Sequence, residues 1–442
     1  MKRIMRKSMS IVEKVMTVCL LFGIFLALLV SCSKDADEGI IIPGPDYTVT
    51  ALKSASSRRV DVLMIGGSNQ LKDGTGYDHG FGKALGEKYG YFATQLFRTG
   101  DRSAMGYLCS NDGMIGQSTG LPSELDVLDL HGYLKGGVFN TPFNGIGIRK
   151  DCPLNVNSNL RFHYAYGTFT DGDGSFEFGV RHGEAPWTLL KKKPVMPTNT
   201  GGYNFVRDYI DLEAASRNVD LEAKWYLPGN SNIIAPFVSY YIRCEDLDKN
   251  NGISVSTLFA DGTASLYDMA HWFINQPDKY LINYFSEIRN LQRINQEKPI
   301  VIVYINSGYN DMTETASPSL SRGKVKNPTS AEAYVDNLDA LINRISSVWG
   351  KTGWSTSELY FWVVPSHPES NPDNSKLVSY RQAAYKYCAA RGNIGFFDIS
   401  QHITADEISS KGYYLGDATD RKHLTQAGYE YISQIIVDQY TK

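Results

Sequence analysis

Five segments of the chain are continuously apolar and rich in β-branched residues, and polar or glycine-containing stretches separate them. Apolar runs of this length are typical of strands in a parallel sheet that is buried on both faces. The runs extend from Val60 to Ile65, Ile253 to Leu258, Pro299 to Ile305, Leu359 to Val364 and Ile394 to Ile399. We therefore expect five strands of one buried parallel sheet.

Helical stretches with start and stop signals alternate with the later strands. Thr329-Ser330-Ala331-Glu332 has the pattern of a capping box, and Gly350 ends the stretch that follows it. The predicted helices run from Tyr334 to Trp349, from about Ser375 to Arg391 and from Thr425 to Tyr440. Alternating strands and helices predict an α/β fold whose functional residues lie at the carboxyl ends of the strands.

Between residues 151 and 248 the pattern changes to short alternating runs that Gly, Asn and Asp turns separate. These runs are Leu160 to Tyr166, Ser175 to Arg181, Val219 to Trp225 and Phe237 to Arg243. They predict an antiparallel β-sandwich inserted between the first and second strands of the α/β fold. Its aromatic residues either pack in its core or stack on sugar rings, and the stacking candidates are Trp187, Trp225 and Tyr226.

The N-terminus has the architecture of an export signal. Basic residues precede an apolar run from Val15 to Val30, which is shorter than a spanning helix needs and ends at Ser31-Cys32. A small residue followed by cysteine resembles the bacterial lipobox, and this resemblance implies lipidation at Cys32. The polar, acidic stretch after it suits a solvated tether and is similar to the surface-export signal of some Gram-negative lipoproteins. We expect an exported lipoprotein of the outer membrane, facing the periplasm or the cell surface.

The length of 442 residues exceeds what one core usually holds and favours two folded units. We expect a signal peptide over 1–31, a tether over 32–56, an α/β core over 57–150 and 249–442, and the insert over 151–248. The net charge of −3 provides no basic surface for nucleic acid. A disulfide between Cys109 and Cys152 is one pairing among those that the sequence leaves open.

Residues that suit acyl transfer follow the predicted strands. Ser68 follows the first strand, Gly262 the second and Asn310 the third, while Asp420 and His423 precede the last helix. A serine hydroxyl needs a base such as imidazole, and the imidazole needs an acceptor that fixes its tautomer. We expect His423 to be the base, Asp420 its partner, and the Ser68 N–H, the Gly262 N–H and the Asn310 amide to form an oxyanion hole.

In this order and context the motifs resemble those of the SGNH/GDSL hydrolase superfamily. Gly66-Gly67-Ser68 corresponds to its Gly-Asp-Ser block with Gly67 in place of aspartate, and Gly308-Tyr309-Asn310-Asp311 matches its Gly-x-Asn-Asp block in full. Asp420-Arg421-Lys422-His423 matches its Asp-x-x-His block. The resemblance covers the two core segments and implies a flavodoxin-like three-layer α/β/α hydrolase core, with Asp311 in a structural role.

Each candidate has a simpler explanation as well. Ser68 alone is a plausible helix cap, Asn310 and Asp311 are common turn residues, and Asp420 and His423 form a plausible helix entry. Three further residues are candidate substrate contacts because they follow strands or the nucleophile turn: His367, His79 and Asp78. Asp398 is expected to cap a strand end. We expect no metal and no cofactor, because no third and fourth ligand accompany Asp420 and His423 at a suggestive spacing.

These features favour a carbohydrate-esterase-like lipoprotein that removes O-acetyl groups from an acylated polysaccharide. Three alternatives remain. An O-acetyltransferase would use the same triad with a sugar hydroxyl in place of water. A catalytically silent glycan-binding lipoprotein is compatible with Gly67 at the position of the family's aspartate. A lipid esterase would need a broad, apolar cleft.

Overall fold

A computed structural model of the chain describes residues 46–71, 76–95, 107–109, 134–135, 146–148, 158–168, 175–181, 188–194, 204–212, 220–226, 237–260, 264–275, 278, 281–282, 285, 300–312, 329–353, 358–369, 375–416 and 422–442. The predicted signal peptide and Cys32 lie outside these residues. Residues at the end of the predicted tether are folded, since helix α2 (Tyr47–Lys53) buries Ala51 and Leu52 in the core.

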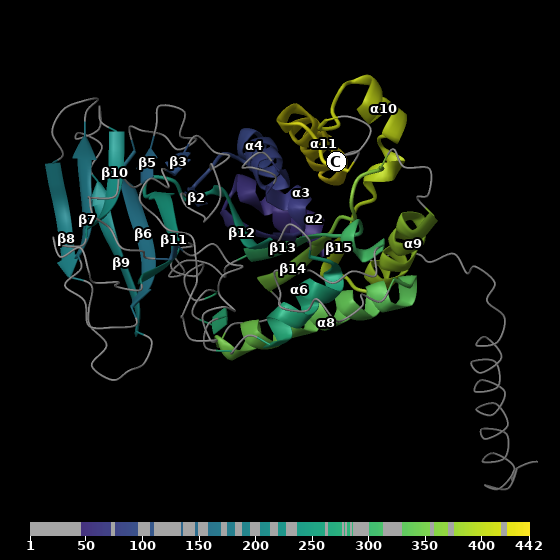
Figure 1. Cartoon of the computed structure of the whole chain (residues 1–442), viewed down its shortest axis with the longest axis horizontal. Helices are drawn as coiled ribbons and strands as arrows, with labels where there is room; N and C mark the ends of the chain where they lie inside the picture. The colour runs from purple at the N-terminus through teal and green to yellow at the C-terminus, as the bar shows by residue number, and fades with distance from the viewer. Residues whose placement is uncertain are drawn as a thin grey trace, which may run out of the picture. The chain divides into compact units, whose positions relative to one another are not determined.

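The centre of the fold is a five-stranded parallel sheet (Figure 1). Its strands in chain order are β1 (Arg59–Gly66), β12 (Gly252–Ala260), β13 (Ile300–Asn306), β14 (Leu359–Val363) and β15 (Ile394–Phe396). They lie side by side in the order β12-β1-β13-β14-β15. This is the 2-1-3-4-5 order of flavodoxin-like folds, and the direction of winding reverses between β1 and β13. All five predicted strands are confirmed.

Helices cover both faces of this sheet, so the core has three layers. Successive side chains of β1 point to opposite faces, with Val62 and Met64 on one side and Leu63 and Ile65 on the other. The first face packs against α2, α4 (Tyr77–Tyr89) and α11 (Gln426–Tyr440). The second packs against α6 (Leu266–Asn275), α8 (Ala331–Lys351) and α9 (Ser375–Ala389).

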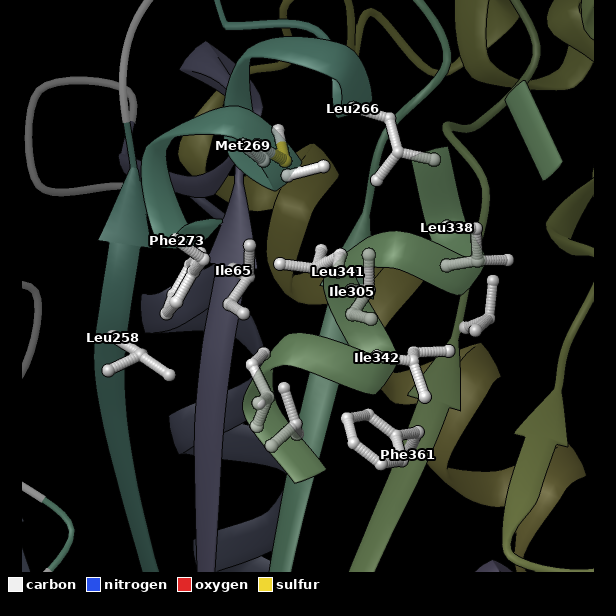
Figure 2. Packing of buried hydrophobic residues seen from close by; sticks show 14 of the residues in the cluster. Ile65, Leu258, Leu266, Met269, Phe273, Ile305, Leu338, Leu341, Ile342 and Phe361 are labelled. Atoms are coloured by element: carbon white, nitrogen blue, oxygen red, sulfur yellow. The ribbon is translucent and has the colours of Figure 1, made fainter. Parts of the chain in front are cut away.

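Figure 2 shows the apolar core on the second face. Met269 and Phe273 of α6 and Leu341 of α8 pack over Ile65 and Ile305, which belong to the neighbouring strands β1 and β13. Burial of each such side chain stabilises the fold by about 1.5–3 kcal/mol relative to an exposed position. The packing therefore fixes the ends of β1 and β13, where two of the candidate site residues follow.

The predicted helices are present, but the capping box is not where the sequence pattern indicates. Ser330 caps α8 by accepting a hydrogen bond from the Ala333 N–H, so the third helical position is Ala333 and Glu332 is one residue too early to complete a box. A reciprocal capping box instead begins α10 (Ala405–Ser410), between Thr404 and Glu407. The remaining short helices are η1 (Ser54–Ser56), α3 (Ser68–Leu71), η5 (Asn310–Met312) and η8 (Ile399–Gln401). Asp398 caps η8 through the Ser400 N–H.

Two antiparallel sheets contain the other described strands. One has the order β3-β5-β10-β7-β8, and the other has the order β2-β11-β6-β9 with β4 paired to β11. Their bounds are β2 (Ala93–Gln95), β3 (Tyr107–Cys109), β4 (Leu134–Lys135), β5 (Ile146–Ile148), β6 (Leu160–Thr168), β7 (Ser175–Arg181), β8 (Thr188–Pro194), β9 (Asn204–Leu212), β10 (Asp220–Tyr226) and β11 (Phe237–Asp246). The four predicted strands of the insert correspond to β6, β7, β10 and β11. Packing of the two sheets as an inserted sandwich stays a prediction.

A buried ionic network joins β1 to the antiparallel strands. Arg59 of β1 donates to the Glu245 carboxylate and to the Asp246 carbonyl, and the other carboxylate oxygen of Glu245 lies 2.7 Å from His163 Nε2. The guanidinium also lies over the Phe92 ring, 4.7 Å from its centroid. Because Arg59 and Glu245 are almost fully buried, each charge depends on the other for its solvation.

None of the helices in the described ranges is both long and apolar enough to cross a membrane. Cys388 is a buried free thiol, whereas Cys152 lies outside the described residues, so the Cys109–Cys152 pairing stays open.

Candidate active site

Ser68 is the first residue of α3 and lies two residues beyond the end of β1. Its Oγ atom lies 2.7 Å from His423 Nε2, which is within hydrogen-bond distance. The next residue, Asn69, is buried and its side-chain oxygen accepts a hydrogen bond of 2.5 Å from the Tyr429 hydroxyl of α11. The start of α3, which carries Ser68, is therefore hydrogen-bonded directly to α11, the helix that follows His423.

The position of this pair within the sheet is the one where open α/β sheets bind ligands. In such sheets the ligand crevice lies outside the carboxyl ends of the strands, at the point where the strand order reverses. Here that point lies between β1, which leads into Ser68, and β13, which leads into Asn310. The order of the strands brings these two residues to one edge of the sheet.

The segment that carries His423 is held by backbone hydrogen bonds. The His423 carbonyl accepts from the Leu415 N–H at 2.8 Å, and the Thr425 N–H donates to the Tyr413 carbonyl at 2.7 Å. Thr425 then caps α11 through its side chain, which accepts from the Gly428 N–H. These bonds fix the backbone on both sides of the imidazole. Asp420 lies outside the described residues, so its predicted pairing with His423 stays a prediction.

Asn310 lies in the turn after β13, and its side-chain amide is oriented by a backbone carbonyl. Its Nδ2 donates to the Ala264 carbonyl at 3.0 Å. An amide nitrogen carries two hydrogens, so this bond sets the plane of the group while a second hydrogen points in another direction. Gly308 begins the turn with φ of +135°, a conformation that other residues rarely adopt. Gly262 lies outside the described residues.

Asp311 joins the Asn310 turn to the start of α6. One carboxyl oxygen accepts from the Gly308 N–H at 2.9 Å, and the other accepts from the Leu266 N–H at 2.8 Å. Burial raises the pKa of Asp311 to about 7, although the two backbone N–H groups act in the opposite direction. The carboxyl group thus ties together the turn that carries Asn310 and the segment that contains Ala264.

His367, beyond the end of β14, is completely buried. Its Nδ1 lies 2.8 Å from the Tyr77 hydroxyl, and its carbonyl accepts from the Tyr309 hydroxyl. Burial, together with the positive charge of Arg381, lowers the pKa of this imidazole to about 3. The ring is therefore neutral at physiological pH. Its predicted role as a substrate contact is untested.

His79 and Asp78 lie on α4 next to α11. His79 Nε2 is 2.7 Å from Glu430, whose second oxygen is 2.5 Å from Lys83 Nζ. Burial raises the pKa of Glu430, but hydrogen bonds from Lys83, Gln426 and His79 outweigh it and lower the pKa to about 2. Asp78 accepts from the N–H of His79. These contacts connect the two helices, and roles in substrate binding stay predictions.

Several residues around the candidate site were not singled out from the sequence. Tyr77, Tyr309 and Tyr429 surround the His367 ring, yet each appears in the sequence as an ordinary core aromatic. The only signal was position, since Tyr77 precedes Asp78 and Tyr309 occupies the variable place of the Gly-x-Asn-Asp motif. Of the stacking candidates, Trp187 is outside the described residues, and the side chains of Trp225 and Tyr226 are likewise not described.

No family model matches the sequence, and no curated protein does. Solved structures do match. An acetyl xylan esterase from the rumen bacterium Butyrivibrio proteoclasticus is 9% identical, with a TM-score of 0.28 over 69% of this chain and 93% of that one. A family two carbohydrate esterase from Clostridium thermocellum, in complex with cellohexaose, is 11% identical, with a TM-score of 0.27 over 70% and 98%.

A third match is a family two carbohydrate esterase from Cellvibrio japonicus, which is 10% identical with a TM-score of 0.26 and covers 70% of this chain and 92% of that one. The identities and TM-scores are low for all three structures. We therefore base the functional proposal on the residues of this chain.

Proposed function

We propose that this protein is an exported serine esterase that removes short acyl groups, chiefly O-acetyl groups, from a polysaccharide. The observation that carries the proposal is the 2.7 Å contact between Ser68 Oγ and His423 Nε2 at the reversal point of the parallel sheet. Serine is a weak nucleophile at neutral pH, and an adjacent imidazole is the usual means of activating it. A contact made only for stability would not need this position at the ligand-binding edge.

In the proposed reaction, Ser68 Oγ attacks the carbonyl carbon of the ester while its proton passes to His423 Nε2. The tetrahedral intermediate then collapses, the sugar hydroxyl leaves with the proton from His423, and the acyl group remains on Ser68. A water molecule attacks this acyl-enzyme by the same route, and the carboxylic acid is released. Together the two steps consume one ester and one water, and they return Ser68 and His423 to their starting forms.

The oxyanion is proposed to bind the Ser68 N–H, the Gly262 N–H and the Asn310 amide. For Asn310, the bond from Nδ2 to the Ala264 carbonyl supports the assignment, because an amide that is already oriented loses little freedom when it meets the oxyanion. Asp420 is proposed to accept from His423 Nδ1 and to stabilise the imidazolium.

The polysaccharide substrate and the cellular location follow from the N-terminus and the family resemblance. A lipid anchor at Cys32 would hold the enzyme at the outer membrane, where extracellular or cell-wall glycans are accessible. The additional β-module and the lack of an apolar lid segment in the sequence favour O-acetyl groups on a polysaccharide over long-chain lipid esters.

The experiment that tests this proposal compares hydrolysis of p-nitrophenyl acetate and p-nitrophenyl octanoate by the purified protein. We expect turnover of the acetate, little turnover of the octanoate, and no turnover in Ser68→Ala. Ser57→Ala, at an exposed serine outside the site, is the matched control and should retain full activity. Release of acetate from acetylated polysaccharides then identifies the glycan.

Persistent activity in Ser68→Ala would contradict the mechanism, and preference for the octanoate would favour a lipid esterase. Transfer of the acetyl group to added sugar in preference to water would favour the O-acetyltransferase. A folded protein that hydrolyses no ester, synthetic or polysaccharide, would favour a glycan-binding lipoprotein.

A further inference from the structure

The His367 imidazole is buried in an aromatic enclosure between the candidate catalytic segments. Its ring centroid lies 5.3 Å from that of Tyr309, 5.9 Å from that of Tyr77 and 6.5 Å from that of Tyr429, all in edge-on contacts. The side chain is 0% exposed. A residue this buried is poorly placed to touch substrate, although its ring neighbour Tyr309 directly precedes Asn310.

The hydrogen bond with Tyr77 fixes the tautomer of this ring. Burial raises the pKa of Tyr77 well above its usual range, so the phenol keeps its proton and needs an acceptor. The neutral His367 ring has one donor nitrogen and one acceptor nitrogen, and Nδ1 is the atom that faces the phenol at 2.8 Å. Tyr77 therefore donates to Nδ1, and the ring hydrogen belongs on Nε2.

The Nε2 atom of His367 is buried and has no hydrogen-bond partner among the residues that the structure describes. The backbone of Lys422, which immediately precedes His423, acts on the His367 ring in the direction that raises its pKa. A buried N–H group without an acceptor is unfavourable, so a ring hydrogen on Nε2 favours an interaction with the backbone of Lys422.

The backbone of His367 connects to the opposite side of the site. Its carbonyl accepts from the hydroxyl of Tyr309, which precedes Asn310, and Ser366 accepts from Arg381 at 2.8 Å through its own carbonyl. One residue thus bridges the turn that carries the candidate oxyanion donor and the segment that carries the candidate base.

On the basis of the proposed esterase function, we propose that His367 is a positioning residue, which holds the Lys422–His423 segment so that His423 Nε2 keeps its hydrogen bond with Ser68. Neutrality is part of this role. A positive charge at His367 would oppose the positive charge that His423 acquires when it takes the serine proton. Burial and the positive charge of Arg381 keep the His367 ring uncharged.

The first test measures kcat and KM for p-nitrophenyl acetate in variants of the full-length protein. In His367→Phe we expect kcat to fall by about 10²-fold with little change in KM, because a small displacement of the base costs this much. His367→Gln keeps an N–H group near the position of Nε2 and should recover kcat to within about tenfold of the wild type. His402→Gln, at an exposed histidine, is the matched control and should leave kcat unchanged.

An unchanged kcat in His367→Phe would overturn the inference, as would a raised KM at constant kcat, which would make His367 a substrate contact. Equal losses in the Phe and Gln variants, in step with a lowered melting temperature, would reduce its role to packing. A wild-type protein without any esterase activity would instead overturn the proposed function, and the positioning role of His367 with it.

A second test does not depend on activity. In protein with ¹⁵N-labelled histidine, NMR should show one ring that stays neutral with its hydrogen on Nε2 between about pH 5 and 8, whereas an ordinary histidine titrates near 6.5. His367→Gln should remove this signal, and Tyr77→Phe should convert it to a mixture of tautomers. A His367 ring that titrates in this range, or that carries its hydrogen on Nδ1, would contradict the inference.

Discussion

Ser68 Oγ and His423 Nε2 lie 2.7 Å apart although 355 positions separate the two residues in the chain. If the pair acts as one catalytic unit, removal of either member should cost as much as removal of both. We expect Ser68→Ala, His423→Ala and the double variant each to lower kcat for p-nitrophenyl acetate by roughly 10⁴-fold or more.

The measurement is kcat for these three variants and the wild type. If the two residues acted independently, the fall in kcat of the double variant would equal the product of the two single falls. That outcome would contradict the assignment of His423 as the base for Ser68.

Asn310 is predicted to stabilise the transition state rather than to bind the ground state. Loss of one oxyanion donor costs about 10²–10³ in kcat in enzymes of this type, so Asn310→Ala should lower kcat by that factor with little change in KM. Asn343→Ala, on the exposed side of α8, is the matched control and should change neither constant. A raised KM with unchanged kcat would show that Asn310 acts in substrate binding alone.

Asp311 should give the protein an unusual dependence of stability on pH. Its pKa is raised to about 7 in the folded state, against about 3.9 in an unfolded chain. The folded state therefore holds more protons than the unfolded state between these values, and the contribution of Asp311 is fully present below about pH 4 and lost as the pH rises through 7.

The measurement is the free energy of unfolding in urea at pH 5 and at pH 8 for the wild type and Asp311→Asn. Relative to the variant, the wild type should lose stability between these pH values. A difference between wild type and variant that stays constant over this range would show that the carboxyl group is already ionised in the folded protein at pH 5.

The buried ionic network of Arg59, Glu245 and His163 should contribute strongly to the stability of the fold. Glu245→Ala leaves the Arg59 guanidinium buried without its counter-ion, and the loss of one partner of a buried pair destabilises by about 3–5 kcal/mol. Asp211→Ala, which breaks the more exposed Arg161–Asp211 pair, is the matched control and should cost less than about 1 kcal/mol. Equal, small changes in the two free energies of unfolding would contradict the prediction.

This network should also weaken in acid. Burial alone would raise the pKa of Glu245, but the hydrogen bond with His163 and the charge of Arg59 outweigh it, and the pKa is lowered overall. Its stabilising effect is therefore present above the unfolded pKa of about 4.3 and is lost as the pH falls through the lower, folded value.

The parallel sheet could be predicted because each of its strands is a continuous apolar run of strand length, the pattern of strands that are buried on both faces. Helix α4 was not predicted, because Gly80, Gly82 and Gly86 lower its helix propensity. Gly80 is required by packing between helices. A Cβ atom at this position would lie 2.4 Å from Ser433 Oγ and 2.7 Å from the Tyr429 carbonyl oxygen of α11. The glycine allows α4 to approach α11 closely.

Strand β8 was not predicted from the sequence either. It contains Lys191, Lys192 and Lys193 in succession, so the run has no alternation of apolar and polar residues, and its assignment depends on pairing with β7. The order of the motifs placed Ser68 and His423 in one candidate site, because motif order carries long-range information that local patterns lack. The tautomer and enclosure of His367 depend on residues from four separate segments, and no spacing in the sequence indicates them.

The most direct test of the central claim is covalent labelling with a fluorophosphonate, which reacts with serines that a base has activated. Mass spectrometry of the labelled protein should locate one phosphonate on Ser68 in the wild type. Labelling should be absent in Ser68→Ala, greatly slowed in folded His423→Ala, and unchanged in Ser57→Ala. Wild-type protein that does not react, or that reacts equally fast without His423, would contradict the proposal that His423 activates Ser68.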